Sequence, residues 1–303
     1  MKKIDKTIIL NNHKVELTNL SKLFWPDEKI SKEDLINYYD LIAKFILPYL
    51  KDRPEALNRF PNGIKGKHFY QKNFEQESIP DWVDTISLES EDKQTNYLLC
   101  QNKETLLYVI NLGCIDLNPW SSRIGKLDYP DYMVIDLDPL DIEFDYVIEV
   151  AQAVKKVLDK AKIPSYPKTS GASGIHIYVP VGAEYTYDQV KQFAKIIAIL
   201  VNKILPATTS VERIPAKRKK KVYLDFLQNN HGQTLAAPYS IRPVSGACVS
   251  TPLKWVEVKR GLRPTDFTIK NIFKRLDLVG DIFEPVLGKG IEIKQGFEIL
   301  RGS

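Results

Sequence analysis

Cysteine is scarce in this chain of 303 residues, and the spacing of the cysteines excludes a common kind of metal domain. The three are Cys100, Cys114 and Cys248, and no two of them have the close spacing of a zinc knuckle. Such an odd and sparse set of thiols is typical of a reducing compartment. We therefore expect no zinc ribbon and a chain that works in the cytosol.

Long apolar runs are missing as well. No run approaches the ~20 residues that a helix needs to span a bilayer. The N-terminal MKKIDKTIIL lacks the apolar stretch of a signal peptide, and no internal repeat or low-complexity segment is visible. We expect a cytoplasmic protein without a membrane partner.

The positive charge of the chain is clustered. The composition is 44% hydrophobic, enough for a sizeable core, and the net charge is +5. AKRKKK at residues 216–221 runs into an apolar segment, and KGKHFYQK at residues 65–72 interleaves aromatic rings with cations. Charge runs are usually solvated loops, and the second segment also suits a core hairpin. The first segment also suits a triphosphate or a nucleic-acid backbone, and the second has the composition of a surface on which bases stack.

Hydrophobic periodicity predicts alternating strands and helices. Between residues 132 and 227 the predicted order is strand, helix, strand, helix, strand. This order resembles half of a ferredoxin-like or RNA-recognition-like βαββαβ unit, with some strands missed. The first 130 residues indicate a smaller αβ module. The predicted helices are 31–46, 103–117, 144–161, 186–205 and 264–276, and the predicted strands are 132–138, 174–181 and 221–227.

Capping residues indicate where several of these helices begin. Ser31 with Asp34, and Thr186 with Gln189, have the spacing of a capping box. Asp145 is a candidate cap for the helix over 144–161. The expected breaks are Pro48 at the end of the first helix and Asn62-Gly63 in a hairpin turn.

Two aspartates, Asp136 and Asp138, end the apolar strand YMVIDLD. Side chains alternate between the faces of a strand, so both point the same way while Leu137 points the other way. Two like charges so close favour a cation between them, and hard oxygen ligands suit Mg²⁺ or Mn²⁺. Asp225 also interrupts an apolar strand, KVYLDFL, and would complete a two-metal site for phosphoryl transfer.

Other interpretations of the aspartate pair are open at this point. The segment continues as DLDPLDIEFD, so the pair also suits a strand that ends in an acidic surface turn. An EF-hand is a poor match, because Pro139 breaks the loop and the required glycine is missing. Phosphatases of the haloacid dehalogenase type share a DxD at a strand end, but they carry Thr or Val where this chain has Leu140.

The loop KTSGASG, residues 168–174, precedes the strand that holds His176. Its two glycines, three hydroxyls and lysine can direct backbone N–H groups at an anion, although the spacing of a P-loop is absent. A lone histidine on a strand is more often structural than catalytic. The place of His176 beside this loop favours a role at the anion.

Seven segments taken together resemble the polymerase domain of bacterial and archaeal DNA ligase D, a member of the archaeo-eukaryotic primase superfamily. The resemblance extends from about residue 17 to about residue 255. The segments are LTNLSKLFWP, RFPNGIKGKHFYQKN, NPWSSR, PDYMVIDLDP, KTSGASGIHIYVP, VYLDFLQNNHGQTLAAPYSIRP and GACVSTPL. The resemblance implies one α+β polymerase domain over 1–303. Its primase-like core, with an RNA-recognition-like βαββαβ sheet and a C-terminal helix, would span about 131–303. The N-terminal αβ module, about 1–130, would bind a DNA 5′-phosphate.

The resemblance also implies roles for individual residues, by match to the motifs of the family. The catalytic and metal-binding triad is expected at Asp136, Asp138 and Asp225. Nucleotide contacts are expected at Ser170, His176, Arg218, Gln228 and Arg242. The DNA 5′-phosphate is expected at Asn19, Lys22 and Lys32, and template stacking at Phe69 and Tyr70. The chain departs from many members at Asn118, where they have His, and at Ser173, where they have Lys, so no nucleotide contact is assigned there.

The implied function is a templated nucleotidyltransferase that fills gaps and extends broken DNA ends in non-homologous end joining. It would use two Mn²⁺ or Mg²⁺ ions, prefer ribonucleotides and act at the nucleoid in a prokaryotic cytoplasm. The expected partners are DNA ends or gaps with a 5′-phosphate, nucleoside triphosphates, a Ku-type protein and a DNA ligase. The K-x-D-G motif of a ligase is absent. The alternatives are a de novo primase, a non-catalytic end-bridging module and a metal-dependent phosphatase.

Overall fold

The computed structural model describes residues 4–90, 93–218 and 220–301, and it has an α+β fold. The chain forms two compact units, neither of which is continuous in sequence. The first unit comprises Met1–Trp120, Thr234–Cys248 and Thr268–Lys270. The second unit comprises Ser121–Gln233, Val249–Phe267 and Asn271–Ser303.

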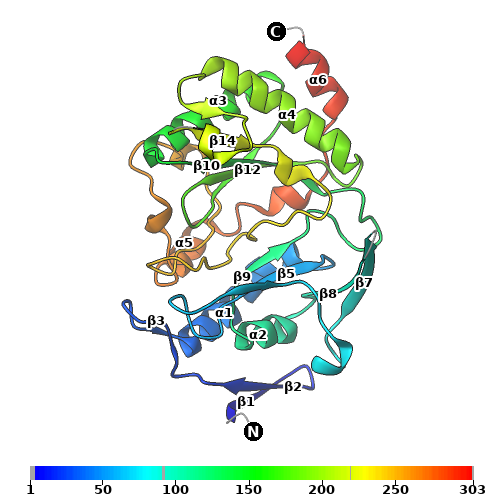
Figure 1. Cartoon of the computed structure of the whole chain (residues 1–303), viewed down its shortest axis with the longest axis vertical. Coiled ribbons are helices and arrows are strands. Elements are labelled where there is room, and N and C mark those ends of the chain that lie inside the picture. The colour runs from blue at the N-terminus through cyan, green and yellow to red at the C-terminus, as the bar shows by residue number, and fades with distance from the viewer. Residues whose placement is uncertain (1–3, 91–92, 219, 302–303) are drawn as a thin grey trace. The chain divides into compact units, whose positions relative to one another are not determined.

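The second unit is built on a five-stranded sheet with the order β11-β12-β10-β14-β13. All neighbouring strands are antiparallel except β13 and β14. Helices α3 and α4 pack against each other and against β10 in this unit (Figure 1). The predicted βαββαβ order is confirmed, and β11 and β13 are the strands that the sequence pattern missed. The bounds are β10 (Tyr132–Pro139), α3 (Phe144–Lys160), β11 (Tyr166–Thr169), β12 (Ile175–Pro180), α4 (Tyr187–Ile204), β13 (Thr209–Ser210) and β14 (Val222–Asp225).

Alternation along the strands separates an apolar face from a polar face. Ile135, Leu137, Ile177 and Leu224 are fully buried in one core with the apolar residues of α3 and α4. Burial of each such side chain stabilises the fold by about 1.5–3 kcal/mol relative to its exposure. The residues between them, Asp136 among them, therefore lie on the opposite face of a sheet that the core holds rigid.

In the last part of the second unit, one helix was predicted over 264–276, and the structure differs from this prediction. Residues 264–266 form a short 3₁₀ turn, and α5 (Ile272–Val279) begins only after a break. The predicted helix over 264–276 is therefore wrong in its first half. A further helix, α6 (Ile293–Arg301), was not predicted. The short 3₁₀ turns of the chain are Gln76–Ser78, Pro215–Lys217, Leu227–Asn229, Trp255–Glu257, Pro264–Asp266 and Glu284–Leu287.

The first unit combines three hairpins, a three-stranded sheet of order β6-β5-β9 and two helices. The helices α1 and α2 pack against each other. The bounds are β1 (Ile4–Leu10), β2 (His13–Thr18), β3 (Leu23–Trp25), β4 (Ile30–Ser31), α1 (Lys32–Leu50), β5 (Glu55–Arg59), β6 (Phe69–Gln71), β7 (Thr85–Ser90), β8 (Lys93–Leu98), α2 (Lys103–Asn111) and β9 (Cys114–Pro119).

The first unit is completed by residues from late in the chain. The hydroxyl of Tyr38 on α1 donates to the backbone oxygen of Tyr239 at 2.6 Å, a pair separated by 201 residues. The neighbouring Tyr39 hydroxyl donates to the oxygen of Ile115 and accepts from the N–H of Ile241. Residues 234–248 are therefore an integral part of this unit.

The predicted capping boxes are confirmed, whereas three other predictions of element ends are wrong. Both boxes have their two reciprocal hydrogen bonds, at the starts of α1 and α4. Pro48 lies inside α1, where it forfeits only one backbone bond within the last turn. Gly113, at φ +88°, ends α2 and turns the chain into β9, so the segment CIDL is a buried strand. Asp145 caps nothing, since it pairs with Arg260 and Arg263.

The expected hairpin at Asn62-Gly63 exists, with a longer loop than a two-residue turn. Strands β5 and β6 pair antiparallel, and residues 60–68 connect them. Gly63 has φ +75°, and a side chain there would lie within 3 Å of the backbone of Phe24. The turn signal was therefore correct, while the loop length was not encoded in it. Among the described residues no helix is long and apolar enough to cross a bilayer.

Candidate active site

Three carboxylates meet on the polar face of the sheet in the second unit. The strand register places Asp136 directly opposite Asp225, and Asp138 follows two residues later on β10. Oxygen atoms of the three groups lie within 4.8 Å of one another. Burial raises the pKa of Asp225, and the N–H of Leu227, which donates to it at 2.8 Å, opposes that shift. Such a set of hard oxygen donors fits a divalent cation such as Mg²⁺ or Mn²⁺.

A buried lysine and histidine continue the same row across the sheet. Lys168 on β11 pairs with His176 on β12, and His176 pairs with Asp136 on β10. The Lys168 ammonium lies 2.9 Å from Nδ1 of His176, and Nε2 of His176 lies 3.4 Å from Oδ1 of Asp136. A lysine in its ordinary charged form can only donate, which assigns Nδ1 as the acceptor and the ring proton to Nε2. His176 therefore directs an N–H at the buried carboxylate.

The loop before β12 is organised around Ser170. The Ser170 hydroxyl accepts from the N–H groups of Ala172 at 3.1 Å and Gly174 at 2.9 Å. These two N–H groups are therefore bonded within the loop. Gly174 is needed for space, because a Cβ there would lie 2.3 Å from the backbone oxygen of Leu137. The loop is thus pressed against the segment that carries Asp136 and Asp138.

A small cavity adjoins the carboxylates and brings two of the predicted nucleotide-site residues together. It has a volume of about 200 Å³, and Asp225, Arg218 and Gln228 are among the residues that line it. The guanidinium carbon of Arg218 lies 3.6 Å from the ring centre of Tyr223, a cation–π contact. Burial and then the charge of Asp225 raise the pKa of Tyr223. The cavity therefore offers a fixed cation beside the acidic cluster.

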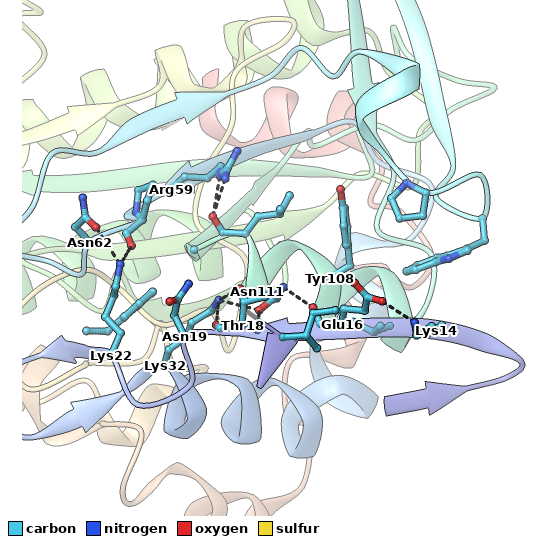
Figure 2. Close-up of a pocket in the computed structure, with 18 residues that line it drawn as sticks. Lys14, Glu16, Thr18, Asn19, Lys22, Lys32, Arg59, Asn62, Tyr108 and Asn111 are labelled. Carbon is cyan, nitrogen blue, oxygen red and sulfur yellow. Dashed lines mark hydrogen bonds and ion pairs between the residues drawn. The ribbon is translucent and has the colours of Figure 1, made fainter. Parts of the chain in front are cut away.

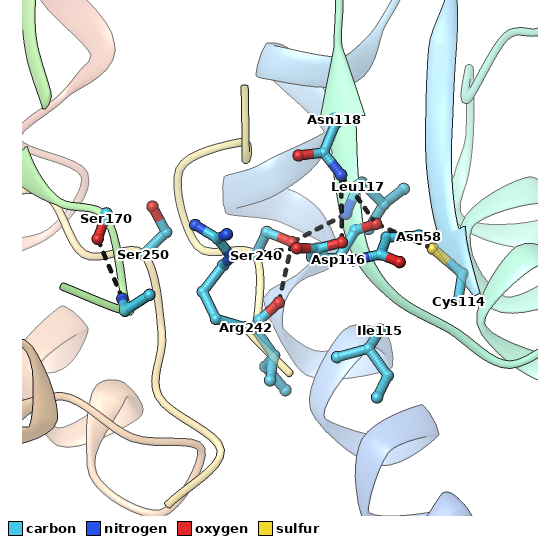
Figure 3. A network of polar contacts seen from close by, with 12 residues as sticks. Asn58, Cys114, Ile115, Asp116, Leu117, Asn118, Ser170, Ser240, Arg242 and Ser250 are labelled. Atoms are coloured by element: carbon cyan, nitrogen blue, oxygen red, sulfur yellow. Dashed lines mark hydrogen bonds and ion pairs between the residues drawn. The ribbon is translucent and has the colours of Figure 1, made fainter. Parts of the chain in front are cut away.

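Arg242 belongs to the first unit, where a buried carboxylate holds it. Its Nε donates to Oδ2 of Asp116 at 3.1 Å (Figure 3). Burial raises the pKa of Asp116, and the positive charge of Arg242 opposes the shift. Asn118 donates through its amide to Oδ1 of Asp116 at 3.1 Å. Asn118 therefore helps to orient the carboxylate that holds Arg242. This is the position at which the resemblance implies His in many members of the family.

The three residues expected at the DNA 5′-phosphate line one large cavity of the first unit (Figure 2). Its volume is about 840 Å³. Lys22 donates to the oxygen of Pro61 and to Oδ1 of Asn62, both at 3.0 Å. Lys32 is almost fully buried and donates to the oxygen of Thr18 at 2.6 Å and to Oδ1 of Asn111 at 2.7 Å. Asn19 has φ +55° and lies in the turn that follows β2.

The two aromatic residues expected at the template lie on β6 with exposed side chains. Phe69 is 46% exposed and Tyr70 is 55% exposed, unusual for rings of this size. The Arg59 guanidinium lies 5.2 Å from the ring centre of Phe69. These exposed rings could accept a stacked base.

Sequence analysis missed several polar residues of these sites. Lys168 was expected in the loop over 168–174 but lies on β11, and Tyr223 gave no signal because it is one polar residue in an apolar strand. Their roles depend on cross-strand register, which the sequence alone does not specify. Asp116 lies on β9, although the sequence pattern predicts a helix over 103–117. Arg213 belongs to the loop before the basic run, and only the structure shows that it lines the same cavity as Arg218.

Comparison with protein families finds a match over most of the chain. A family model described as "LigD, primase-polymerase domain" matches residues 31–283. The "Bifunctional non-homologous end joining protein LigD" of Bacillus subtilis is 34% identical over 269 residues, which cover 88% of this chain and 43% of that protein. The "Multifunctional non-homologous end joining protein LigD" of Pseudomonas aeruginosa is 29% identical over 269 residues, 88% of this chain and 32% of that protein. The chain thus spans less than half the length of these relatives.

A solved structure has the same fold. It is the polymerase domain of Mycobacterium tuberculosis ligase D in complex with DNA, and the TM-score is 0.84 at 26% identity. The superposition covers 91% of this chain and 99% of that one.

Proposed function

Since this chain belongs to the family of LigD primase-polymerase domains, we propose that it is a template-directed nucleotidyltransferase. It fills gaps and extends broken DNA ends in non-homologous end joining, with ribonucleotides as its preferred substrates. The observation that carries the proposal is the convergence of Asp136, Asp138 and Asp225 within 4.8 Å, on neighbouring strands of a sheet. The names of the relatives and the DNA in the similar solved structure support DNA ends as the substrate.

In this proposal the three carboxylates hold two divalent ions, Mn²⁺ or Mg²⁺. When bound, such ions supply activation of an attacking hydroxyl and neutralisation of charge on a leaving pyrophosphate. The residues of the chain provide the frame. Nε2 of His176 lies 3.4 Å from Oδ1 of Asp136, and the other ring nitrogen of His176 lies 2.9 Å from the Lys168 ammonium. The set therefore needs little reorganisation at the moment of reaction.

The nucleotide in this proposal is held by residues around the acidic cluster. Arg218 offers a fixed positive charge and Gln228 an amide in the small cavity beside Asp225, which suits a triphosphate. Ser170, in the loop before β12, and His176, on β12, contact the same nucleotide in this proposal. A nucleotide contact is also proposed for Arg242, which Asp116 holds.

The first unit in this proposal recognises the downstream strand and the template. Asn19, Lys22 and Lys32 bind the 5′-phosphate, and Phe69 and Tyr70 stack on template bases. Stacking of this kind tolerates any sequence, as gap filling requires. The partners that complete the reaction on broken ends are a Ku-type protein and a DNA ligase, acting on the bacterial nucleoid. The whole chain then works as one polymerase domain.

Primer extension on a gapped duplex tests this function. The substrate carries a downstream 5′-phosphate, and four reactions compare ribonucleotides with deoxyribonucleotides in Mn²⁺ and in Mg²⁺. We expect template-dependent addition of one or a few nucleotides, faster with ribonucleotides. The matched control is the same gap with a 5′-hydroxyl, which we expect to be filled more slowly.

Three outcomes would contradict the proposal. Synthesis on single-stranded DNA without a primer would indicate a de novo primase. Absence of any extension, together with tight DNA binding, would indicate a module that only bridges ends. Phosphate release from a generic monoester would instead indicate a phosphatase.

A further inference from the structure

The cavity that contains Asn19, Lys22 and Lys32 is much larger than a phosphate needs. Its volume of about 840 Å³ lies in the range of roughly 300–1,000 Å³ that pockets for whole organic ligands occupy. Lys22 and Lys32 make one end of it cationic, whereas Lys14, near the other end, is paired with Glu16. Beyond Thr18 the lining continues along β2 to Lys14, and on the facing side to Tyr108 (Figure 2). The dimensions therefore call for a ligand group in addition to phosphate.

The far end of the cavity is aromatic. Pro80, Trp82 and Tyr108 line it, and the two rings meet edge to face at 5.9 Å. His13 is stacked on the indole of Trp82 at 5.1 Å with an angle of 7° between the rings. Because His13 is not part of the lining, the indole reaches the cavity through surface that His13 leaves uncovered. The stack holds this ring in one orientation before any ligand arrives.

The buried Glu104 anchors the aromatic end from behind. One of its oxygens lies 3.8 Å from Nδ1 of His13 and accepts from the amide of Asn11 at 2.6 Å. Glu104 itself is on α2, the helix that also carries Tyr108. The ring stack is therefore tied to the packed part of the unit.

Unused hydrogen-bond donors also distinguish the far end. Within residues 4–90, 93–218 and 220–301, neither the indole N–H of Trp82 nor the hydroxyl of Tyr108 has a hydrogen-bond partner. The cationic side chains differ, because Arg59 already donates to Leu112 and Gln71. The one acidic group in the lining, Glu16, is paired with Lys14 at 2.6 Å and so repels an anion little. The cavity thus combines a positive end with an aromatic end that has donors to spare.

We propose that this cavity binds a whole nucleotide at the 5′ end of a DNA strand. Its phosphate lies at Asn19 and Lys22, and its base lies against Trp82 and Tyr108. This inference rests on the proposed function, which assigns only the phosphate. An aromatic surface takes any base by stacking, and the free N–H and O–H donate to acceptor atoms on the edge of the base or on the sugar. The site thus recognises both the phosphate and the base at the 5′ end of the strand.

Binding to four gapped duplexes tests the proposal with the full chain at one fixed salt concentration. The downstream strand ends in a normal 5′-phosphorylated nucleotide, in a 5′-phosphorylated abasic residue, or in the 5′-hydroxyl form of each. We expect the wild type to lose affinity about tenfold when the base alone is removed, in fluorescence anisotropy. Trp82→Leu should lose this dependence on the base and keep its preference for phosphate. Trp82→Phe, which retains a stacking ring, is the matched control and should resemble the wild type.

The outcomes separate this inference from the proposed function. If the wild type prefers phosphorylated ends but ignores the base, the inference is wrong and the phosphate site stands. The same conclusion follows if Trp82→Leu keeps full dependence on the base. If phosphorylation has no effect on any end, the phosphate site itself fails.

A second measurement covers the case in which Trp82→Leu does not fold. The probes are a nucleoside 5′-monophosphate and inorganic phosphate, titrated into the wild type and into Trp82→Phe. We expect the mononucleotide to change tryptophan fluorescence in the wild type and not in Trp82→Phe, with no change from inorganic phosphate. Equal responses of the two proteins to the mononucleotide would overturn the inference.

Discussion

Lys168 has no exposed surface, and its hydrogen bonds explain why a lysine is tolerated at this buried position. Its ammonium group donates to Nδ1 of His176 and, at 2.5 Å, to the hydroxyl of Ser250. A buried charge is costly unless it is well bonded, so a chain retains one only where its neighbours bond it well. Here it fixes which nitrogen of His176 carries the proton, and thereby which side of the ring faces Asp136.

We expect Lys168→Met to slow primer extension roughly tenfold or more, the effect of losing one hydrogen bond to a charged group in a buried site. The same variant should change the ¹⁵N shifts of His176 in the metal-free protein, because the Nε2–H form is no longer enforced. Lys156→Met, an exposed lysine on α3, is the control. Unchanged His176 shifts in Lys168→Met would show that the lysine serves packing alone.

Glu55 is a buried acid of the first unit, and its burial affects the stability of the fold. It is fully buried, and neither carboxyl oxygen has a hydrogen-bond partner among the residues that the structure describes. Burial raises its pKa well above the ordinary value of 4.5, and the charge of Arg53 opposes the shift only in part. The folded chain therefore binds the proton of Glu55 more tightly than the unfolded chain does.

This raised pKa predicts a pH dependence of stability. Below the ordinary value both states hold the proton, so the contribution of Glu55 is fully present. Above it the unfolded chain releases the proton while the folded chain keeps it, and stability falls by about 1.4 kcal/mol per pH unit until the folded pKa is reached. Glu55→Gln should abolish this slope in urea unfolding at pH 5, 6 and 7, unlike the exposed Glu89→Gln. Parallel curves for Glu55→Gln and wild type would contradict the assignment.

At the scale of elements, Gly174 sets how closely the loop before β12 approaches β10. A methyl group at this position would lie 2.3 Å from the backbone oxygen of Leu137, between the two aspartates. Backbone cannot give way as a flexible side chain does, so β10 must shift.

We expect Gly174→Ala to lower the free energy of unfolding by about 1–3 kcal/mol, the usual cost of overpacking, and to abolish extension. Urea unfolding and primer extension measure the two effects. Ser173→Ala, one residue away with an exposed side chain, should change neither. Full extension activity in Gly174→Ala would show that the spacing between loop and strand is not critical.

Patterns of the sequence were sufficient for the longer strands and helices α3 and α4 of the second unit, and insufficient for short elements and for segments that fit a strand and a helix equally well. Capping boxes marked the starts of α1 and α4, because the hydrogen bonds that define them are local. The segment CIDL was assigned to a helix, because a short apolar run fits a buried strand and a helix equally well. Strand β11 was missed because it has only four residues and contains Pro167.

The candidate site likewise contains residues that local sequence patterns predict and residues that they do not. The same-face position of Asp136 and Asp138 follows from alternation, which is local. The neighbour of Asp136 on β14 was chosen correctly only because Asp225 also interrupts an apolar strand. The partners that depend on register or on distant loops, such as Lys168 and Asp116, have no local signature.

At the scale of the whole molecule, a bound metal should appear as stability. Three carboxylates within 4.8 Å repel one another, and a cation that binds only the folded chain stabilises it by mass action. We expect Mn²⁺ to raise the melting temperature of the wild type and to leave that of Asp136→Asn with Asp138→Asn unchanged. A chelator should reverse the shift and abolish extension while DNA binding persists. An equal shift in the double variant would place the ion elsewhere.

Residues 234–248 belong to the first unit, so this unit cannot be completed early in the synthesis of the chain. A ribosome releases a chain from its N-terminus, so Tyr38 emerges 201 residues before the Tyr239 oxygen that it must bond. The central strands of the second unit are complete at Asp225, before that partner exists. The half of the protein that is made first therefore cannot be completed until the central sheet of the second unit has been made.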